Sequence, residues 1–317
     1  MSRRTQARRA DLRPTLEPAG ELPREGQTFA GKSLLVRYVN FVKLPHTVFA
    51  LPFALLGVVY ASTVAPVTAA KVGLVIVAFT AARFAAMGFN RIVDREADAR
   101  NPRTQNRELP AGRLSVRAAG AAVAAGAAVF VAAAGLLNPV CLVLSPLALA
   151  WILAYSHTKR WTHWSHFWLG AALAIAPAGG YLAVTGQWSD PWWTLILLAV
   201  AVTAWVGGFD IFYALQDEDF DRSHGLKSAV IALGRPGAIF AAKLAHGVTI
   251  ALLVAFGLGA GFGAAYYGGI VVAAGLLAWE HRLVKPDDLS TLDAAFFTMN
   301  GVMSIVVFVG ALVDRVL

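Results

Sequence analysis

Apolar residues in this chain fall in long blocks separated by short polar segments, instead of recurring as amphipathic stripes. Several blocks approach the ~20 residues that a helix needs to cross ~30 Å of hydrocarbon. Strand-like alternation with regular turns is absent from the sequence, so a β-barrel is not expected. The pattern predicts an all-α, polytopic membrane protein with nine transmembrane helices near residues 42–62, 69–89, 116–137, 139–157, 164–185, 191–215, 236–258, 261–280 and 292–313.

The composition also favours a membrane protein. Of the 317 residues, 57% are hydrophobic and only 15% are charged, whereas a soluble domain carries about a quarter charged residues. A large soluble helical protein is therefore disfavoured. Cys141 is the only cysteine, which excludes an intrachain disulfide and a multi-cysteine metal cluster, and we expect a buried free thiol.

Basic residues are distributed unequally between the two sides of the predicted helices. The segment before the first helix is rich in Arg and Lys, whereas the loops on the opposite side retain only Lys71 and Arg315. Because basic loops stay in the cytoplasm, we expect a multi-pass protein of the inner (plasma) membrane with a cytoplasmic N-terminus. Orientation then accounts for the net charge of +8 without a nucleic-acid partner. The loops expected in the cytoplasm are 90–117, 157–163, 216–235 and 281–291.

The N-terminal segment is polar, contains three prolines and has no apolar h-region, so it is not a secretory signal. We expect a disordered cytoplasmic tail over residues 1–36, followed by a membrane domain over residues 37–317. An Arg-rich organellar transit peptide is the alternative, although the acidic residues in this segment argue against it.

Two acidic motifs leave even-numbered predicted helices into the same compartment. In the first, Asn90, Asp94 and Asp98 are spaced four residues apart. Each step of four rotates only ~40° around a helix, so these side chains share one face. The second motif follows the sixth predicted helix, and the same reasoning places on one face Asp210, Tyr213, Asp217 and Asp221. Asp210 lies within the membrane portion, where an ionisable group is costly and indicates function.

Stacked carboxylates repel one another, and two such faces indicate that a cation lies between them. Oxygen ligands with room for water and phosphate oxygens are what Mg²⁺ prefers. Metal and surrounding basic residues together predict a diphosphate site. The alternative is that the charges only solvate helix ends, but the occurrence of two motifs in one compartment favours the site. The basic residues concerned are Arg103, Arg107, Arg113, Lys159, Arg160 and Lys227.

At these residues the chain resembles the UbiA superfamily of intramembrane prenyltransferases. The first motif is similar to the family's N-D-x-x-D-x-x-x-D, and residues 103–115 resemble its R-T-x-x-R-x-L-x-x-G continuation. The second motif, with Tyr213-Ala214 before Asp217 and Asp221, resembles the family's Y-A followed by D-x-x-x-D, and residues 155–160 resemble its Y-x-x-T-K-R element. The resemblance extends from about residue 38 to the C-terminus and implies a UbiA-type bundle of nine helices.

The chain departs from the family pattern at two positions. Arg91 stands where many members have Asp, and Glu108 replaces a Pro. Together with residues 40–52, these departures resemble the 4-hydroxybenzoate polyprenyltransferase-like branch. That branch leaves two acceptors open, 4-hydroxybenzoate in ubiquinone biosynthesis and 1,4-dihydroxy-6-naphthoate in menaquinone biosynthesis.

The resemblance also implies roles for the motif residues. Mg²⁺ held by Asp94, Asp98, Asp217 and Asp221 binds the diphosphate of a polyprenyl donor, and Asn90 helps to orient it. Tyr155 and Tyr213 line the position of the allylic cation, where a cation–π contact contributes ~1–2 kcal/mol; interfacial anchoring is the alternative for both. The residues expected to neutralise the leaving diphosphate are Arg103, Arg107, Lys159, Arg160 and Lys227.

The carboxylate of an aromatic acid needs a cationic or hydrogen-bonding partner. We predict Lys43 and His46 for this role, although Lys43 is also interpretable as a charge that only sets topology. Arg83 lies well inside a predicted helix, and the sequence leaves open whether it pairs with polar groups or lines a cavity. The histidines at 157, 163 and 166 are expected at the membrane interface without acidic partners.

The expected function is therefore transfer of a polyprenyl group from its diphosphate to an aromatic acid on the cytoplasmic side of the membrane. Haem O synthesis and prenylation in chlorophyll or glycerol-phosphate lipids are less similar members of the same superfamily. The alternative from another class is a secondary transporter with an ion site at Asp210. Transporters place such groups near the bilayer midplane, whereas most of these acids lie at the cytoplasmic helix ends, which favours the enzyme.

Overall fold

The computed structural model describes residues 29, 31, 33–44, 47, 50–285, 289 and 299–317. This part of the chain is built of helices, and the prediction of an all-α protein is confirmed for it. In chain order the helices are α1 (Leu34–Phe41), α2 (Leu51–Ala61), α3 (Ala69–Val93), α4 (Arg95–Arg100), α5 (Val116–Leu137), α6 (Pro139–Thr158), α7 (Ser165–Thr185), α8 (Trp192–Ala214), η2 (Leu215–Asp217), α9 (Glu218–Ser223), α10 (Ala229–Ala260), α11 (Ala264–Leu283) and α13 (Asn300–Val316).

Six segments of the described chain are long and apolar enough to cross a membrane: α3, α5, α6, α7, α10 and the run from α8 to α9. Helix α2 is apolar but shorter. Each predicted transmembrane segment overlaps a helix, with α11 and α13 at the last two positions. The membrane prediction is thus supported, whereas the count of nine crossing helices stays a prediction.

The predicted N-terminal tail is described only in part. Residues 1–28 lie outside the described residues, as does His46. Helix α1 begins at Leu34, so the end of the predicted tail is already helical, with Ser33 accepting a hydrogen bond from the backbone N–H of Val36. The predicted boundary at residue 37 thus falls within α1 and stays a prediction.

Helix starts follow local sequence signals. The side chains of Thr68, Ser115, Asn138 and Ser228 each accept a hydrogen bond from the backbone N–H three residues further on, and they start α3, α5, α6 and α10. Such a cap satisfies one of the N–H groups that the first turn leaves without a partner. These boundaries are therefore encoded by single residues.

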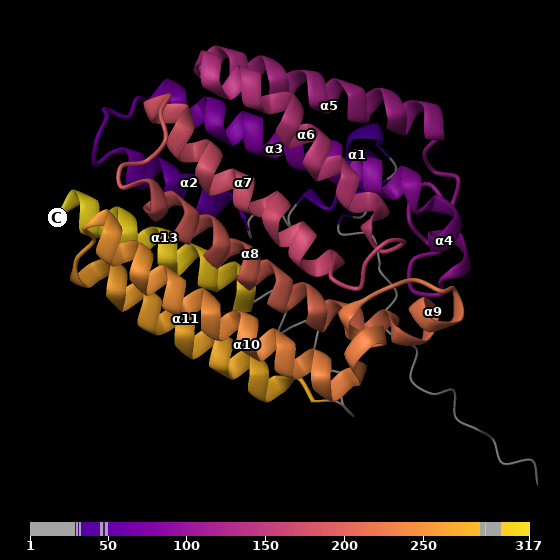
Figure 1. Ribbon diagram of the computed structural model, residues 1–317. Helices are drawn as coiled ribbons and strands as arrows, with labels where there is room; N and C mark the ends of the chain where they lie inside the picture. The colour runs from indigo at the N-terminus through magenta and orange to yellow at the C-terminus, as the bar shows by residue number, and fades with distance from the viewer. Residues whose placement is uncertain are drawn as a thin grey trace, which may run out of the picture.

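Helix α8 lies at the centre of the bundle, between α7 and α10, and packs against both (Figure 1). Helices α3 and α5 pack together on one side, and α11 and α13 on the other. The short helices α4 and α9, which follow α3 and α8, lie at the same end of the bundle (Figure 1). Because the two acidic motifs run from the ends of α3 and α8 into these short helices, the fold places the motifs at one end of the molecule.

Glycine allows α2 and α7 to approach each other closely. A Cβ at Gly180 would lie 2.1 Å from the carbonyl oxygen of Ala54, and one at Gly57 would lie 2.0 Å from that of Pro177. Both obstacles are backbone atoms, which do not move aside as a flexible side chain does. The approach therefore depends on glycine from both helices, as is common where small residues bring membrane helices together.

Gly180→Ala is expected to lower the free energy of unfolding by about 1–3 kcal/mol, because the added methyl group pushes α2 away from α7. Gly179→Ala is the matched control, since a Cβ at Gly179 meets nothing within 4 Å. Alanine is the better helix former by about 1 kcal/mol, so the control should be neutral or slightly stabilising. Thermal unfolding of both variants in detergent tests this, and equal melting temperatures would contradict it.

Candidate active site

Both acidic motifs pass through a bend at the end of a long helix. Asp94 joins α3 to α4 with φ −91° and ψ 3°, and Asp217 joins η2 to α9 with φ −101° and ψ 7°. This sparsely populated backbone region is frequent in active sites. Across the first bend, Asp94 N–H donates to Asn90 O at 2.9 Å and Asp98 N–H to Asp94 O at 2.8 Å. The predicted four-residue spacing thus persists through the bend, although neither motif is one uninterrupted α-helix.

A cavity of about 290 Å³ lies between the two motifs and is lined by residues of α3, α4, α6, α7, α8 and α9. All predicted site residues line it except Lys227, and His46 lies outside the described residues. The predicted residues brought together here are Lys43, Asn90, Asp94, Asp98, Arg103, Arg107, Tyr155, Lys159, Arg160, Asp210, Tyr213, Asp217 and Asp221.

The carboxylates of the first motif each have a partner that the sequence had also singled out. Asn90 Nδ2 donates to Asp94 Oδ2 at 2.9 Å. Arg107 Nη1 donates to Asp98 Oδ1 at 2.6 Å, and both side chains are largely buried. Charge-assisted hydrogen bonds of this kind hold the two carboxylates in place.

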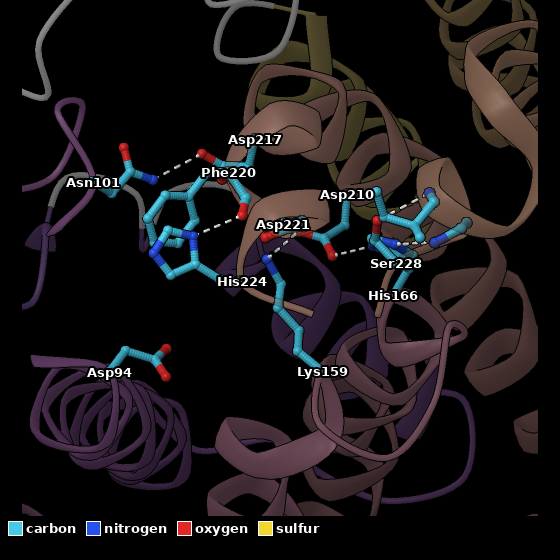
Figure 2. A network of polar contacts seen from close by, with 12 residues as sticks. Asp94, Asn101, Lys159, His166, Asp210, Asp217, Phe220, Asp221, His224 and Ser228 are labelled. Atoms are coloured by element: carbon cyan, nitrogen blue, oxygen red, sulfur yellow. Dashed lines mark hydrogen bonds and ion pairs between the residues drawn. The ribbon is translucent and has the colours of Figure 1, made fainter. Parts of the chain in front are cut away.

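Arg103 connects the region after the first motif to the second motif. Its Nε and Nη2 donate to the two oxygens of Asp217 at 3.0 and 2.7 Å, and its Nη1 donates to the hydroxyl of Tyr213 at 2.8 Å. Asn101 Nδ2 also donates to Asp217 Oδ1, at 3.3 Å (Figure 2). The two-pronged contact specifies the orientation of the carboxylate as well as its charge. Asn101 was not predicted, because no motif spacing marks it.

Lys159 at the end of α6 lies against the last carboxylate of the second motif. Its Nζ is 3.8 Å from Asp221 Oδ2 (Figure 2). Burial lowers the pKa of Lys159, but Asp221 and the neighbouring carboxylates raise it more, so that its pKa lies above the ordinary lysine value. The ammonium is therefore charged at neutral pH. The pKa of Asp94 is raised, first by burial and second by the Asp98 carboxylate.

The donor atoms present fit a divalent cation shared with a phosphate group. Among the described residues, Asp98 Oδ2 and Asp221 Oδ2 are buried and accept no hydrogen bond, and each belongs to a different motif. Within the same part of the chain, no group of three or more His, Cys, Asp and Glu side chains is arranged to hold a metal by itself. Mg²⁺ is commonly held by one or two carboxylates together with substrate phosphates.

Two departures from the family pattern have clear positions. Arg91 is 7% exposed and lines the cavity, so it adds a positive charge to the cavity wall. Glu108 lies 3.5 Å from Arg113 in an ion pair within the loop after α4. The first departure therefore changes the charge of the cavity, whereas the second pairs with a charge within its own loop.

One predicted site residue lies apart from the cavity, and one expectation about the histidines is corrected. Lys227 donates from Nζ to the carbonyl of Trp161 at 3.2 Å and does not line the cavity, so its contact with diphosphate stays a prediction. His166 was expected at the membrane interface without an acidic partner. It is instead fully buried, and its Nδ1 lies 2.7 Å from Asp210 Oδ2. Packing of α7 on α8 brings this pair together across 44 positions, which no spacing rule reveals.

A second, apolar cavity of about 490 Å³ adjoins the first and is lined mainly by α3, α5, α6 and α7. Aromatic and aliphatic residues such as Phe79 and Trp151 form its walls. Arg83, Asn90 and Tyr155 line both cavities and therefore mark their junction. The question that the sequence left open for Arg83 is answered, since Arg83 lines the cavity and donates from Nε to the Thr47 hydroxyl at 3.2 Å. The site thus combines a charged compartment with an apolar one.

A sequence model of the UbiA prenyltransferase family matches residues 50–302. Among curated proteins, the 4-hydroxybenzoate octaprenyltransferase of Alkalilimnicola ehrlichii is 33% identical over 232 residues, which cover 73% of this chain and 78% of that protein. The protein of the same name from Nitrosococcus oceani is 33% identical over 231 residues, with 73% and 80% covered.

Solved structures show the same fold. The apo structure of a UbiA homolog from Aeropyrum pernix K1 matches with a TM-score of 0.78 and 36% identity, covering 86% of this chain and 98% of that one. A UbiA homolog from Archaeoglobus fulgidus bound to GPP and Mg²⁺ matches with a TM-score of 0.66 and 18% identity, covering 89% and 100%. The match to the Archaeoglobus fulgidus protein, at 18% identity, concerns the fold alone.

Proposed function

This chain belongs to the UbiA prenyltransferase family, and we propose that it transfers a polyprenyl group from polyprenyl diphosphate to the ring of an aromatic acid, with release of diphosphate. The acceptor is 4-hydroxybenzoate or 1,4-dihydroxy-6-naphthoate, and the name of the 33%-identical relatives favours the first. Transfer takes place at the cytoplasmic face of the inner membrane, in the orientation that the basic loops indicate.

The observation that carries this proposal is the junction of a charged cavity with an apolar one. A polyprenyl diphosphate has a highly charged head and a long apolar tail. The cavity of about 290 Å³ contains the basic and acidic groups that suit the head, and the adjoining cavity of about 490 Å³ suits the tail. An amphiphile with a charged head and an apolar tail therefore fits the two adjoining cavities.

The leaving diphosphate is stabilised by cations that already point into the cavity. Arg103, Arg107 and Lys159 are charged, line the cavity and are held there by the motif carboxylates. Preorganised charges of this kind stabilise a leaving group without reorganising during the reaction. Asp94, Asp98, Asp217 and Asp221 would hold Mg²⁺ together with the substrate phosphates, with Asn90 orienting Asp94, and the ion would supply additional positive charge for the diphosphate.

The proposed reaction places the allylic cation beside Tyr155, with Tyr213 in the adjoining charged cavity. If head and tail occupy the two cavities, the carbon that loses diphosphate lies at their junction, next to Tyr155. Tyr213 lines the charged cavity, and its hydroxyl is anchored by Arg103. Aromatic faces stabilise a desolvated cation by about 2 kcal/mol. This supports the predicted role of both tyrosines over simple interfacial anchoring.

The position of Arg83 supports an acceptor that carries a carboxylate. Its guanidinium lies at the junction of the cavities, and within the described part of the chain no carboxylate pairs with it. Arg83 is partly buried, and a cation that is partly withdrawn from water favours an anionic partner. The carboxylate of the aromatic acid is that partner in our proposal, with the ring then facing the allylic carbon. Lys43, the sequence-based candidate, lines the charged cavity and is the second possibility.

The transporter alternative is less well supported. Such proteins bind ions near the bilayer midplane in broken helices. Here the metal-binding candidates follow the ends of α3 and α8, and Asp210 is engaged by His166. The arrangement therefore favours an enzyme whose charged substrate enters from the aqueous side.

The proposal is tested with purified protein in lipid nanodiscs, Mg²⁺, a polyprenyl diphosphate and each of the two acids in turn. The expected result is one prenylated acid, identified by mass spectrometry, and an equal amount of released diphosphate. Excess EDTA is the control, and added Mg²⁺ should restore activity. If neither acid is prenylated over a range of donor chain lengths, the proposed function is wrong.

A further inference from the structure

His166 connects three helices at one edge of the charged cavity. It lies in the first turn of α7 and is 0% exposed. Its Nδ1 is 2.7 Å from Asp210 Oδ2 on α8, and its Nε2 accepts a hydrogen bond from the backbone N–H of Ala229 at 3.2 Å. Figure 2 shows the ring between Asp210 and the start of α10 at Ser228.

These two contacts assign the proton on the ring. The Ala229 N–H is a donor, so Nε2 must accept and carries no hydrogen. Nδ1 therefore carries the hydrogen and donates to Asp210. His166 is thus a neutral imidazole in one tautomer, and the backbone at the start of α10 determines which one. The Ala229 N–H itself belongs to the first helical turn, where such donors lack a partner within the helix.

Asp210 consequently differs from the three cavity carboxylates that form ion pairs, and like Asp94 it is held by an uncharged side chain. Asp98, Asp217 and Asp221 lie against Arg or Lys side chains, whereas the assigned partner of Asp210 is a neutral ring. It lines the cavity as a carboxylate whose orientation the ring determines. A diphosphate is repelled by such a group. An uncharged hydrogen-bond donor on the substrate, such as a phenolic hydroxyl, is attracted.

We infer that His166 is a positioning residue that holds Asp210 as the hydrogen-bond acceptor for the ring hydroxyl of the aromatic acceptor. This inference rests on the proposed function. Asp210 receives the hydroxyl hydrogen in a hydrogen bond, which raises the electron density of the ring and helps to align it. Arg83 and Asp210 then bind opposite ends of the acid, its carboxylate and its hydroxyl. The acceptor class follows as an aromatic acid that carries a free hydroxyl group.

His166→Gln and His166→Leu form the matched pair that tests this inference. The carboxamide of Gln offers one acceptor for Ala229 N–H and one donor for Asp210, as the ring does, whereas Leu offers neither. Gln is expected to keep the KM for 4-hydroxybenzoate within about threefold of the wild-type value. Leu is expected to raise it about tenfold, the loss typical of one hydrogen bond to a charged group. The KM for polyprenyl diphosphate should change less than about twofold in both variants.

A second measurement keeps the test decisive if His166→Leu does not fold. Asp210→Asn retains the shape of the side chain and should give the same tenfold rise for the hydroxy acid. Binding of 4-methoxybenzoate, which has no hydroxyl hydrogen, should be unchanged in every variant. A wild-type-like KM in both His166→Leu and Asp210→Asn, or a rise confined to the diphosphate, would overturn the inference. Wild-type protein that prenylates no acid at all would instead overturn the proposed function.

Discussion

Asp94→Ala is expected to reduce the rate of prenyl transfer about 10³-fold or more, while the protein still inserts into the membrane. The substitution removes one of the carboxylates proposed to hold Mg²⁺ at the diphosphate. Loss of one preorganised electrostatic contact at a reacting group typically lowers the rate by about 10²–10³, and loss of a metal ligand removes more than one contact. Asp217→Ala should have the same effect and, in addition, leaves the buried Arg103 without its carboxylate.

The matched controls are acids on the same short helices that are exposed to solvent. Glu96 pairs with Arg95 at the surface, and Asp219 is exposed beside the second motif. Alanine at either position should leave the rate within about twofold of the wild-type value, because exposed ion pairs contribute little. Diphosphate release is measured at saturating Mg²⁺, and size-exclusion chromatography reports folding. Near-normal rates for Asp94→Ala or Asp217→Ala would contradict the proposed metal ligands.

The second large effect is expected from Arg83→Leu, which should raise the KM for the aromatic acid about a hundredfold. Truncating one partner of a buried, hydrogen-bonded charge pair costs about 2–5 kcal/mol. The fold should tolerate the change well. In the described part of the chain no carboxylate pairs with Arg83, so its removal leaves no buried anion behind. The KM for polyprenyl diphosphate should stay close to the wild-type value.

Lys43→Leu is the comparison that separates the two candidates for the acceptor carboxylate. If Arg83 binds the acid, Lys43→Leu changes its KM only slightly. The wild-type preference for 4-hydroxybenzoate over 4-hydroxybenzamide, which lacks the carboxylate, should disappear in Arg83→Leu and persist in Lys43→Leu. The opposite pattern would transfer the role to Lys43.

Much of the site followed from the sequence because its residues recur at helical spacing. Four-residue steps placed Asp94 and Asp98 on one face, and two motifs of this kind in one compartment indicated a shared cation. The structure adds the contacts between the predicted residues. Arg103 and Asp217 are 114 positions apart and meet in a two-pronged contact, and Lys159 lies against Asp221. The spacing of residues within one helix does not indicate which side chains of another helix they contact.

The residues that sequence reasoning missed have no local signal. Asn101 and His166 belong to no motif, and each is important because of one partner on a distant helix, Asp217 or Asp210. Lys227 shows the converse. Its place after the second motif suggested a diphosphate contact, yet its ammonium donates to the Trp161 carbonyl. Once the chain leaves a regular helix, a residue's proximity to a motif in the sequence is thus a weak guide to where its side chain points.

The sequence alone was sufficient for the properties that depend on local chemistry: apolar helices, the two acidic faces and the compartment they share. These follow from hydropathy, helical period and charge, which neighbouring residues determine. The two acidic motifs became one site, with an apolar cavity beside it and His166 behind Asp210, only through the packing of α3, α6, α7 and α8. That packing depends on shape, as at Gly57 and Gly180, where the absence of a side chain permits the contact.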